Sequence, residues 1–219
     1  FEVKVSEEKI NNAKPDVLIA GAMKCIMNAQ QLCTESKLLH EHQMYARSFA
    51  LSHFSREEFA KALMLYRTAI EVKCGIKVDW KRLNRRFRDH KQKLVNDRLM
   101  SALICSLADA DPSDGVNIFN SSMAGIEFSN NRKNECLYVD WNNGYFHLPE
   151  EIISEELSKR NLDLATYKIL ILSPKMMRIN EILNVTKDEA RAVFEVLGQE
   201  FFDNPGEFIK EKLGLVKKT

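Results

Sequence analysis

The stretch from residue 39 to residue 73 contains neither proline nor glycine, the residues that most readily interrupt a helix. Its apolar side chains recur at steps of three and four residues and form two rows. The first row is Leu51, Phe54, Ala62, Leu65 and Ala69, and the second is Phe59, Leu63, Tyr66 and Ile70. A helix that is apolar nearly all round is buried. The sequence therefore predicts one long central helix, against which the rest of the chain has to pack.

Two further helices are predicted beside this one. Residues 15 to about 36 show the same apolar steps, and Pro15 suits a first-turn position. Asp79 is a suitable N-cap for a helix from Trp80 to about Leu107. With only 8 Gly and 5 Pro, the chain has few residues for turns. The predicted fold class is all-α, a helical bundle with long antiparallel helices.

The middle of the chain carries the one clear β signal. Residues 109–115 are rich in turn formers and predict a loop, with a shorter helix after it. Within residues 136–148, Asn143-Gly144 favours the positive φ angles of a tight turn. A small β-hairpin is predicted there.

Extra helices are predicted after the hairpin. Pro149 should begin a helix that reaches about residue 172. Thr186 and Glu189 form a capping-box pattern for another helix to about residue 202, and a last short helix should follow Pro205. We therefore expect a domain over residues 1–149 and a C-terminal helical extension over residues 150–219 that packs on the same core.

Bulk composition narrows the function classes. The 32 Lys and Arg residues against 31 acidic residues give a net charge of +1, which offers no global reason to expect nucleic acid as a partner. Any phosphate recognition must then be local. No apolar run approaches the roughly 20 residues that a membrane span needs. The start of the chain also lacks the pattern of a signal peptide. We expect a cytoplasmic protein with no membrane partner.

The five cysteines are odd in number, widely spaced and without a Cys-x-x-Cys pair. They are Cys25, Cys33, Cys74, Cys105 and Cys136. We expect small core residues in a reducing compartment, with neither a disulfide framework nor zinc.

The predicted third helix concentrates positive charge around one histidine. The cations near His90 are Arg82, Arg85, Arg86, Arg88, Lys91 and Lys93. Arginine suits phosphate oxygens, and a histidine can take or give a proton near neutral pH. Metal-free RNA cleavage needs a base for the 2′-hydroxyl and a cation for the charge that develops at phosphorus. On an unbroken helix Arg86 would share the face of His90, whereas Arg85 would be turned about 140° away. A second subunit could bring Arg85 to His90.

A structural interpretation stays open beside the catalytic one. His90 continues the apolar row of Trp80, Leu83 and Phe87, so it is predicted to face the core. There it could simply pair with Glu58 or Glu57 of the central helix, where the Glu58 carboxylate is expected to face protein.

Metal and nucleotide chemistry find little support. His53 and Glu57 lie one helical turn apart, but neither Glu-x-x-His pairs nor His-Glu-x-x-His occurs. A glycine-rich phosphate loop and a serine nucleophile elbow are also missing from the sequence. We expect no metal and no cofactor.

Three segments together resemble the AbiV family of abortive-infection proteins, over about residues 13–149. The central helix carries Arg56-Glu57-Glu58-Phe59-Ala60-Lys61-Ala62, the next helix Arg88-Asp89-His90-Lys91-Gln92-Lys93-Leu94, and a later segment Leu137-Tyr138-Val139-Asp140. That family belongs to the HEPN superfamily of helical bundles, which commonly dimerise and often cleave RNA through an Arg followed four to six residues later by His. The resemblance thus implies a HEPN-like bundle.

The resemblance also implies roles for particular residues. His90 would be the general base or acid and Arg85 the cation that stabilises phosphate, with Arg86 or Asn84 as a helper. Glu58 and Lys61 would organise the site, and the remaining supporting residues would be Glu57, Arg88, Asp89 and Lys93.

The function that this resemblance implies is antiphage defence. The expected protein is a homodimeric effector that acts on RNA or the ribosome, as a metal-independent endoribonuclease, with a phage-encoded protein as its trigger. The alternative is a non-catalytic protein that inhibits translation by binding ribosomes or a phage protein.

Overall fold

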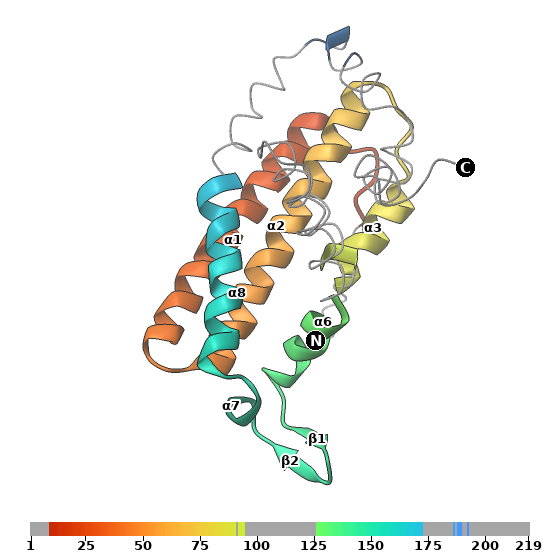
Figure 1. Cartoon of the computed structure of the whole chain (residues 1–219). Helices are drawn as coiled ribbons and strands as arrows, with labels where there is room; N and C mark the ends of the chain where they lie inside the picture. The colour runs from red at the N-terminus through yellow and green to blue at the C-terminus, as the bar shows by residue number, and fades with distance from the viewer. Residues whose placement is uncertain are drawn as a thin grey trace, which may run out of the picture.

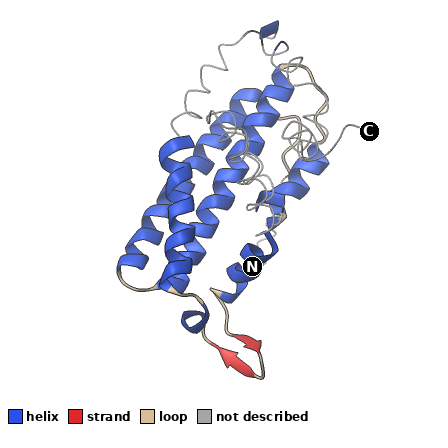
Figure 2. Cartoon of the chain, in the orientation of Figure 1, coloured by secondary structure: helices blue, strands red, loops and turns tan. Residues whose placement is uncertain are grey.

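The computed structural model describes residues 9–90, 92–94 and 126–172, and the single positions 186, 188, 189 and 192. Its main body is a pair of long antiparallel helices, α1 (Pro15–Glu41) and α2 (Tyr45–Lys73), with α8 (Glu155–Tyr167) alongside both (Figure 1). Helix α3 (Trp80–Arg88) follows α2, and α6 (Ile126–Glu135) precedes a small hairpin. Figure 2 shows that helix dominates the described residues. The predicted all-α bundle is confirmed.

The turn between the two long helices differs from the prediction. Helix α1 continues to Glu41, and α2 begins at Tyr45 rather than at residue 39. Gln43 adopts a left-handed conformation with φ of 61°, a position that glycine or asparagine usually fills. Because glutamine gives no such signal, the sequence did not show where the chain turns.

The apolar core lies between α1 and α2 and combines large apolar side chains with alanines. Its buried members are Leu18, Ile19, Ala22, Ile26 and Ala29 on α1, and Phe59, Ala62, Leu65, Tyr66 and Ala69 on α2. Trp80 and Phe87 of α3 pack against the same cluster. The predicted burial of α2 on most sides is confirmed, since 17 of its residues are buried.

Serines hold the other end of the helix pair together. The Ser36 hydroxyl donates to the carbonyl oxygen of Ser48 at 2.8 Å, and the Ser48 hydroxyl donates to the carbonyl oxygen of Ser36 at 2.8 Å. The Ser55 hydroxyl donates to the carbonyl oxygen of Ala29 at 2.7 Å. These reciprocal bonds satisfy buried hydroxyls and let the two backbones approach closely.

The predicted single helix from Trp80 to residue 107 is wrong, because the chain breaks at Asp89. Helix α3 ends at Arg88, and Asp89 has extended backbone angles, with φ of −82° and ψ of 110°. Its carboxylate oxygen accepts a hydrogen bond from the Gln92 amide at 3.1 Å, as an N-cap does. Helical residues resume at His90, and residues 95–125 lie outside the described part of the chain.

The hairpin is confirmed but is shorter than predicted. Strand β1 (Asp140–Asn142) pairs antiparallel with β2 (Tyr145–His147), and Trp141 lies opposite Phe146. Asn143 and Gly144 have φ of 51° and 86°, the positive angles expected of an Asn-Gly turn. The segment before β1 is irregular, so residues 136–139 are not strand.

The helix predicted from Pro149 to residue 172 is divided. Helix α7 (Pro149–Ile152) ends before Ser154, whose side chain accepts from the Leu157 amide at 3.3 Å and starts α8. A π-helical segment, η1 (Lys168–Leu172), continues α8.

The capping box at Thr186 is confirmed. The Thr186 amide donates to the Glu189 carboxylate at 2.8 Å, and the Glu189 amide donates back to the Thr186 hydroxyl at 3.3 Å. The loop predicted at 109–115 and the helix predicted after Pro205 lie outside the described residues. In the part of the chain that the structure describes, no helix is long and apolar enough to cross a membrane.

Candidate functional site

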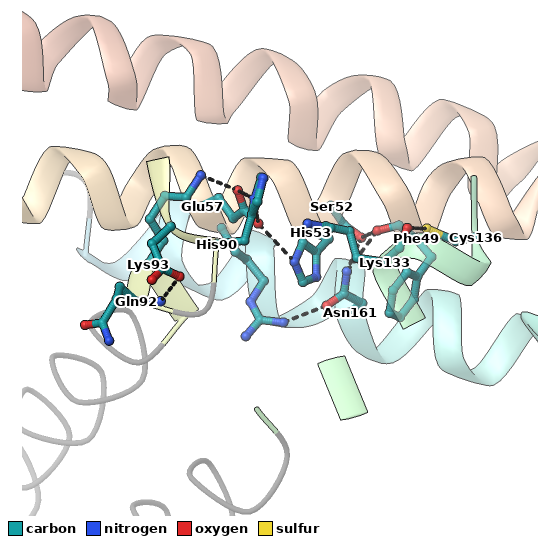
Figure 3. A network of polar contacts seen from close by, with 12 residues as sticks. Phe49, Ser52, His53, Glu57, His90, Gln92, Lys93, Lys133, Cys136 and Asn161 are labelled. Atoms are coloured by element: carbon teal, nitrogen blue, oxygen red, sulfur yellow. Dashed lines mark hydrogen bonds and ion pairs between the residues drawn. The ribbon is translucent and has the colours of Figure 1, made fainter. Parts of the chain in front are cut away.

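A buried carboxylate on α2 gathers three basic side chains, and we call this group the Glu57 cluster (Figure 3). Glu57 is only 4% exposed. The Nδ1 atom of His90 lies 2.8 and 2.7 Å from its two oxygens, and the Lys93 ammonium lies 2.7 Å from Oε2. The Nε2 atom of His53, one turn earlier on α2, lies 3.3 Å from Oε1.

The break at Asp89 is what places His90 and Lys93 on this carboxylate. Asp89 caps a new helical turn, and its carbonyl oxygen accepts from the Lys93 amide at 3.1 Å. Residues three apart on a helix share a face, so His90 and Lys93 both point at Glu57.

The cluster keeps Glu57 ionised. Burial by itself would raise the pKa of this carboxyl, but contacts with His53, Lys93 and His90 outweigh burial and lower the pKa from 4.5 to about 2. Burial lowers the pKa of His53 below 6.5, even though the nearby Glu57 acts to raise it. At neutral pH the cluster therefore contains a carboxylate, an ammonium and an uncharged buried imidazole.

His90 faces solvent as well as Glu57, which corrects the prediction that it faces the core. Its side chain is 46% exposed, because the break at Asp89 removes it from the apolar row of α3. An ionised carboxylate can only accept hydrogen bonds, so Nδ1 of His90 must donate. In the neutral ring, Nε2 then carries the lone pair, and among the described residues no hydrogen bond to Nε2 is found. This is the carboxylate–imidazole arrangement that prepares a general base.

Glu58 belongs to a different environment from Glu57. It forms an ion pair with Lys61, and its side chain is 18% exposed, which confirms that it faces protein to a large extent. It also lies beside Cys25 of α1, whose pKa rises to about 11, mainly through burial and then through the Glu58 charge. Of the two predicted partners for His90, the structure thus selects Glu57.

The two arginines proposed for catalysis, Arg85 and Arg86, are neighbours on α3 but differ in exposure. Arg86 is partly buried, and its pKa falls to about 10 because of burial and then the charges of Arg67 and Arg82. The predicted alignment of Arg86 with His90 on one helix face is wrong, since the helix ends between them. Arg85 is exposed, and none of the hydrogen bonds found among the described residues joins it to the Glu57 cluster.

Arg85 instead lines a pocket beside the segment that precedes α1. We call this the α3 pocket; its volume is about 450 Å³, and its lining is Lys9, Ile10, Asn11, Trp80, Lys81, Asn84, Arg85 and Arg88. Asn84 is part of this lining and also contacts the segment before α1. The Asn84 side chain accepts from the Ile10 amide at 3.0 Å and donates to the Ile10 carbonyl oxygen at 2.7 Å. Asn84 therefore clamps the N-terminal segment to α3, and its polar atoms are already occupied.

A polar chain that the sequence analysis missed connects α2 to α8. Arg56 donates to the Asn161 side-chain oxygen at 2.7 Å, and the Asn161 amide donates to the Ser52 hydroxyl at 2.6 Å (Figure 3). Ser52, His53, Arg56 and Glu57 recur at steps of three and four residues over consecutive turns of α2. That spacing was the available signal for a polar face inside the bundle.

Neither thiol chemistry nor a metal centre emerges from the described residues. Cys25, Cys33, Cys74 and Cys136 are free, and burial raises the pKa of Cys136 to about 12. The raised pKa values of Cys25 and Cys136 make these two thiols poor nucleophiles at neutral pH. Within the described ranges, no group of three or more His, Cys, Asp and Glu side chains is arranged to hold a metal ion.

The fold and the site define an all-α helical bundle in which the turn after Asp89 packs on a buried glutamate of the long helix α2. A family model identifies it further. The model described as AbiV matches residues 17–169, and the chain belongs to this family of abortive-infection HEPN proteins. Neither the curated proteins nor the solved structures gave a match.

Proposed function

We propose that this abortive-infection protein cleaves RNA without a metal ion, with His90 as the general base. The observation that carries the proposal is the bond from His90 Nδ1 to the buried Glu57 carboxylate, at 2.7 Å. It fixes the ring and directs the Nε2 lone pair away from α2 toward the exposed side. Family membership supplies the wider context of phage defence.

The proposed reaction is an internal transfer at phosphorus. His90 Nε2 takes the proton of a 2′-hydroxyl, whose oxygen then bonds to the adjacent phosphorus. The bond from phosphorus to the 5′-oxygen breaks, and that oxygen leaves with a proton taken from water, while the His90 imidazolium returns its proton to the solvent. The products are a 2′,3′-cyclic phosphate and a 5′-hydroxyl end. Arg85 stabilises the charge on the phosphate oxygens, which arginine does well through paired N–H donors.

Arg85 lines the α3 pocket, and no hydrogen bond found among the described residues joins it to the Glu57 cluster of its own chain. The proposal therefore includes a homodimer, in which the second copy supplies the arginine. HEPN domains often dimerise and act on RNA. In the proposed assembly, two basic α3 helices face one another, and each His90 works beside the Arg85 of the other copy. The Glu57 cluster orients the base within each chain, whereas the cation is shared across the dimer.

The test is cleavage of end-labelled RNA by purified protein in the presence of a chelator. We expect cyclic phosphate ends, and a rate that falls about 10²- to 10⁴-fold in His90→Gln. The matched control is His42→Gln, since His42 is an exposed histidine in the turn between α1 and α2. Equal cleavage by the parent and His90→Gln, or cleavage that needs a divalent cation, would overturn the proposal.

A non-catalytic function has one specific observation in its favour. The Glu57 cluster also joins the turn after Asp89 to α2 by an ion pair with the buried Lys93, which is a structural role. In this second candidate the basic surface inhibits translation by binding ribosomes or a phage protein. Protection of cells from phage separates the two, because a non-catalytic protein would still protect when it carries His90→Gln.

A further inference from the structure

The α3 pocket combines a cavity, an aromatic wall and several basic side chains. Four of its eight lining residues are basic, namely Lys9, Lys81, Arg85 and Arg88, and none is acidic. Over the whole chain the acidic and basic residues nearly cancel, with a net charge of +1. This local excess therefore marks a surface suited to an anion, and the arginine forks suit phosphate in particular.

The shape and lining of the pocket restrict the anion further. A volume of about 450 Å³ is much larger than one phosphate group needs and falls in the range of small-ligand sites. Trp80 supplies an aromatic wall at the start of α3, and nucleobases stack on such side chains. A phosphate with an attached base satisfies both the cations and the indole.

One wall of the pocket is held in place by hydrogen bonds. This wall, residues 9–11, is held to α3 by the two hydrogen bonds between Asn84 and the backbone of Ile10. A third bond from Asn84 to the Trp80 carbonyl oxygen, at 2.7 Å, fixes the amide over the same turn. The segment that carries Lys9 is therefore fixed against α3 before a ligand binds.

We propose that the α3 pocket binds one nucleotide unit of single-stranded RNA, with its phosphates on Arg88, Lys9 and Lys81 and its base on Trp80. This rests on the proposed function only in naming RNA as the ligand. It adds a binding subsite that is separate from the Glu57 cluster. The pocket holds the strand, and His90 acts on a neighbouring linkage.

The binding test uses an oligonucleotide that the protein cannot cleave. The probe is a labelled single-stranded 2′-O-methyl RNA of about ten nucleotides, a length that covers a typical single-strand site. The variant is Lys9→Gln with Lys81→Gln, both exposed and outside the proposed catalytic machinery. We expect an affinity loss of about 10-fold and a salt-dependence slope smaller by about 1.4, since each lost phosphate contact on a single strand removes about 0.7.

The matched control removes the same charge elsewhere. Lys24→Gln with Arg160→Gln changes two exposed cations on α1 and α8, and it should leave the affinity within about 2-fold of the parent. If both double variants weaken binding equally, the effect is general electrostatics and the pocket assignment is wrong. Parental affinity in Lys9→Gln with Lys81→Gln would overturn it as well.

A fluorescence measurement tests whether a base of the probe stacks on Trp80. The chain has two tryptophans, so in Trp141→Phe the remaining indole is Trp80. The 2′-O-methyl probe should quench its emission saturably, and inorganic phosphate should not. If uridine monophosphate binds as tightly as the oligonucleotide, the site takes a free nucleotide and the RNA assignment fails. Because the probe resists cleavage, a protein that binds it in the pocket but cuts no RNA would refute only the proposed function.

Discussion

Glu57 lies on α2, whereas the cations of the α3 pocket lie on α3 and on the segment before α1, and the two groups differ in their surroundings. The Glu57 carboxylate is buried and surrounded by His53, His90 and Lys93 within one chain. The pocket cations are lined up without an acidic neighbour in the lining. A compensated buried charge fixes geometry, whereas a local excess of basic side chains on a surface attracts an anion. The comparison separates a region that orients a reactive group from a region that binds.

Removing the central carboxylate should have the largest effect. Glu57→Gln keeps the shape of the side chain but leaves the buried Lys93 ammonium without its counter-ion. We expect the free energy of unfolding to fall by about 3–5 kcal/mol, the usual result of breaking a buried pair from one side. Urea denaturation at pH 7 measures it.

The neighbouring glutamate provides the control. Glu58→Gln breaks an ion pair with Lys61, whose side chain is 24% exposed. For such a partly exposed pair we expect a loss of about 1 kcal/mol or less. If the two variants lose equal stability, Glu57 is not the centre of a buried cluster and the contrast between the two regions fails.

His53 should make stability fall on mild acidification, an effect of intermediate size. Its pKa is lowered below 6.5 in the folded chain, so the unfolded chain binds a proton there first as pH drops. The contribution of His53 to the free energy of unfolding is therefore fully present above about pH 6.5. Below that pH it declines by at most about 1.4 kcal/mol per pH unit. Urea denaturation between pH 7.5 and pH 5, about the range in which histidine titrates, measures the slope.

Two variants isolate this slope. His53→Gln should flatten the slope, because the variant has no imidazole to protonate at that position. His42→Gln removes an exposed histidine and should retain the slope. A steep slope that survives in His53→Gln would assign the acid sensitivity to another group.

The most local effect is expected at the Asn84 side of the α3 pocket. Asn84→Ala removes two hydrogen bonds to Ile10, which are worth about 1 kcal/mol each. The loss should be local, so hydrogen exchange at the Ile10 amide should accelerate while α2 amides keep their protection. Unchanged exchange at Ile10 would show that Asn84 does not hold the wall of the pocket.

Much of the fold could be predicted from local signals. The absence of breakers indicated the long helix α2, and Asn143-Gly144 indicated the hairpin turn. Thr186 and Glu189 indicated a capping box, and its bonds are present. In each case the residue type itself favours the observed backbone, so no knowledge of distant contacts was needed.

The details of the site depended on contacts between segments far apart in the chain. An aspartate inside a helix costs well under 1 kcal/mol, so Asp89 alone did not predict a break. The break places His90 and Lys93 on Glu57, 33 residues earlier for His90. Helix α2 is apolar on most sides, so periodicity could not choose between Glu57 and Glu58. The break at Asp89 and the choice of Glu57 over Glu58 were both decided by tertiary contacts, which local sequence patterns do not contain.

The tautomer of His90 tests the central claim most directly. Nitrogen-15 spectra of the histidine rings in alkaline buffer, assigned with His90→Gln, show which ring nitrogen carries the proton. Bonding to Glu57 predicts a proton on Nδ1 and a lone pair on Nε2, and loss of that preference in Glu57→Gln. A proton on Nε2 of His90 in the parent protein would contradict the account, because the ring would then offer no base to a bound RNA.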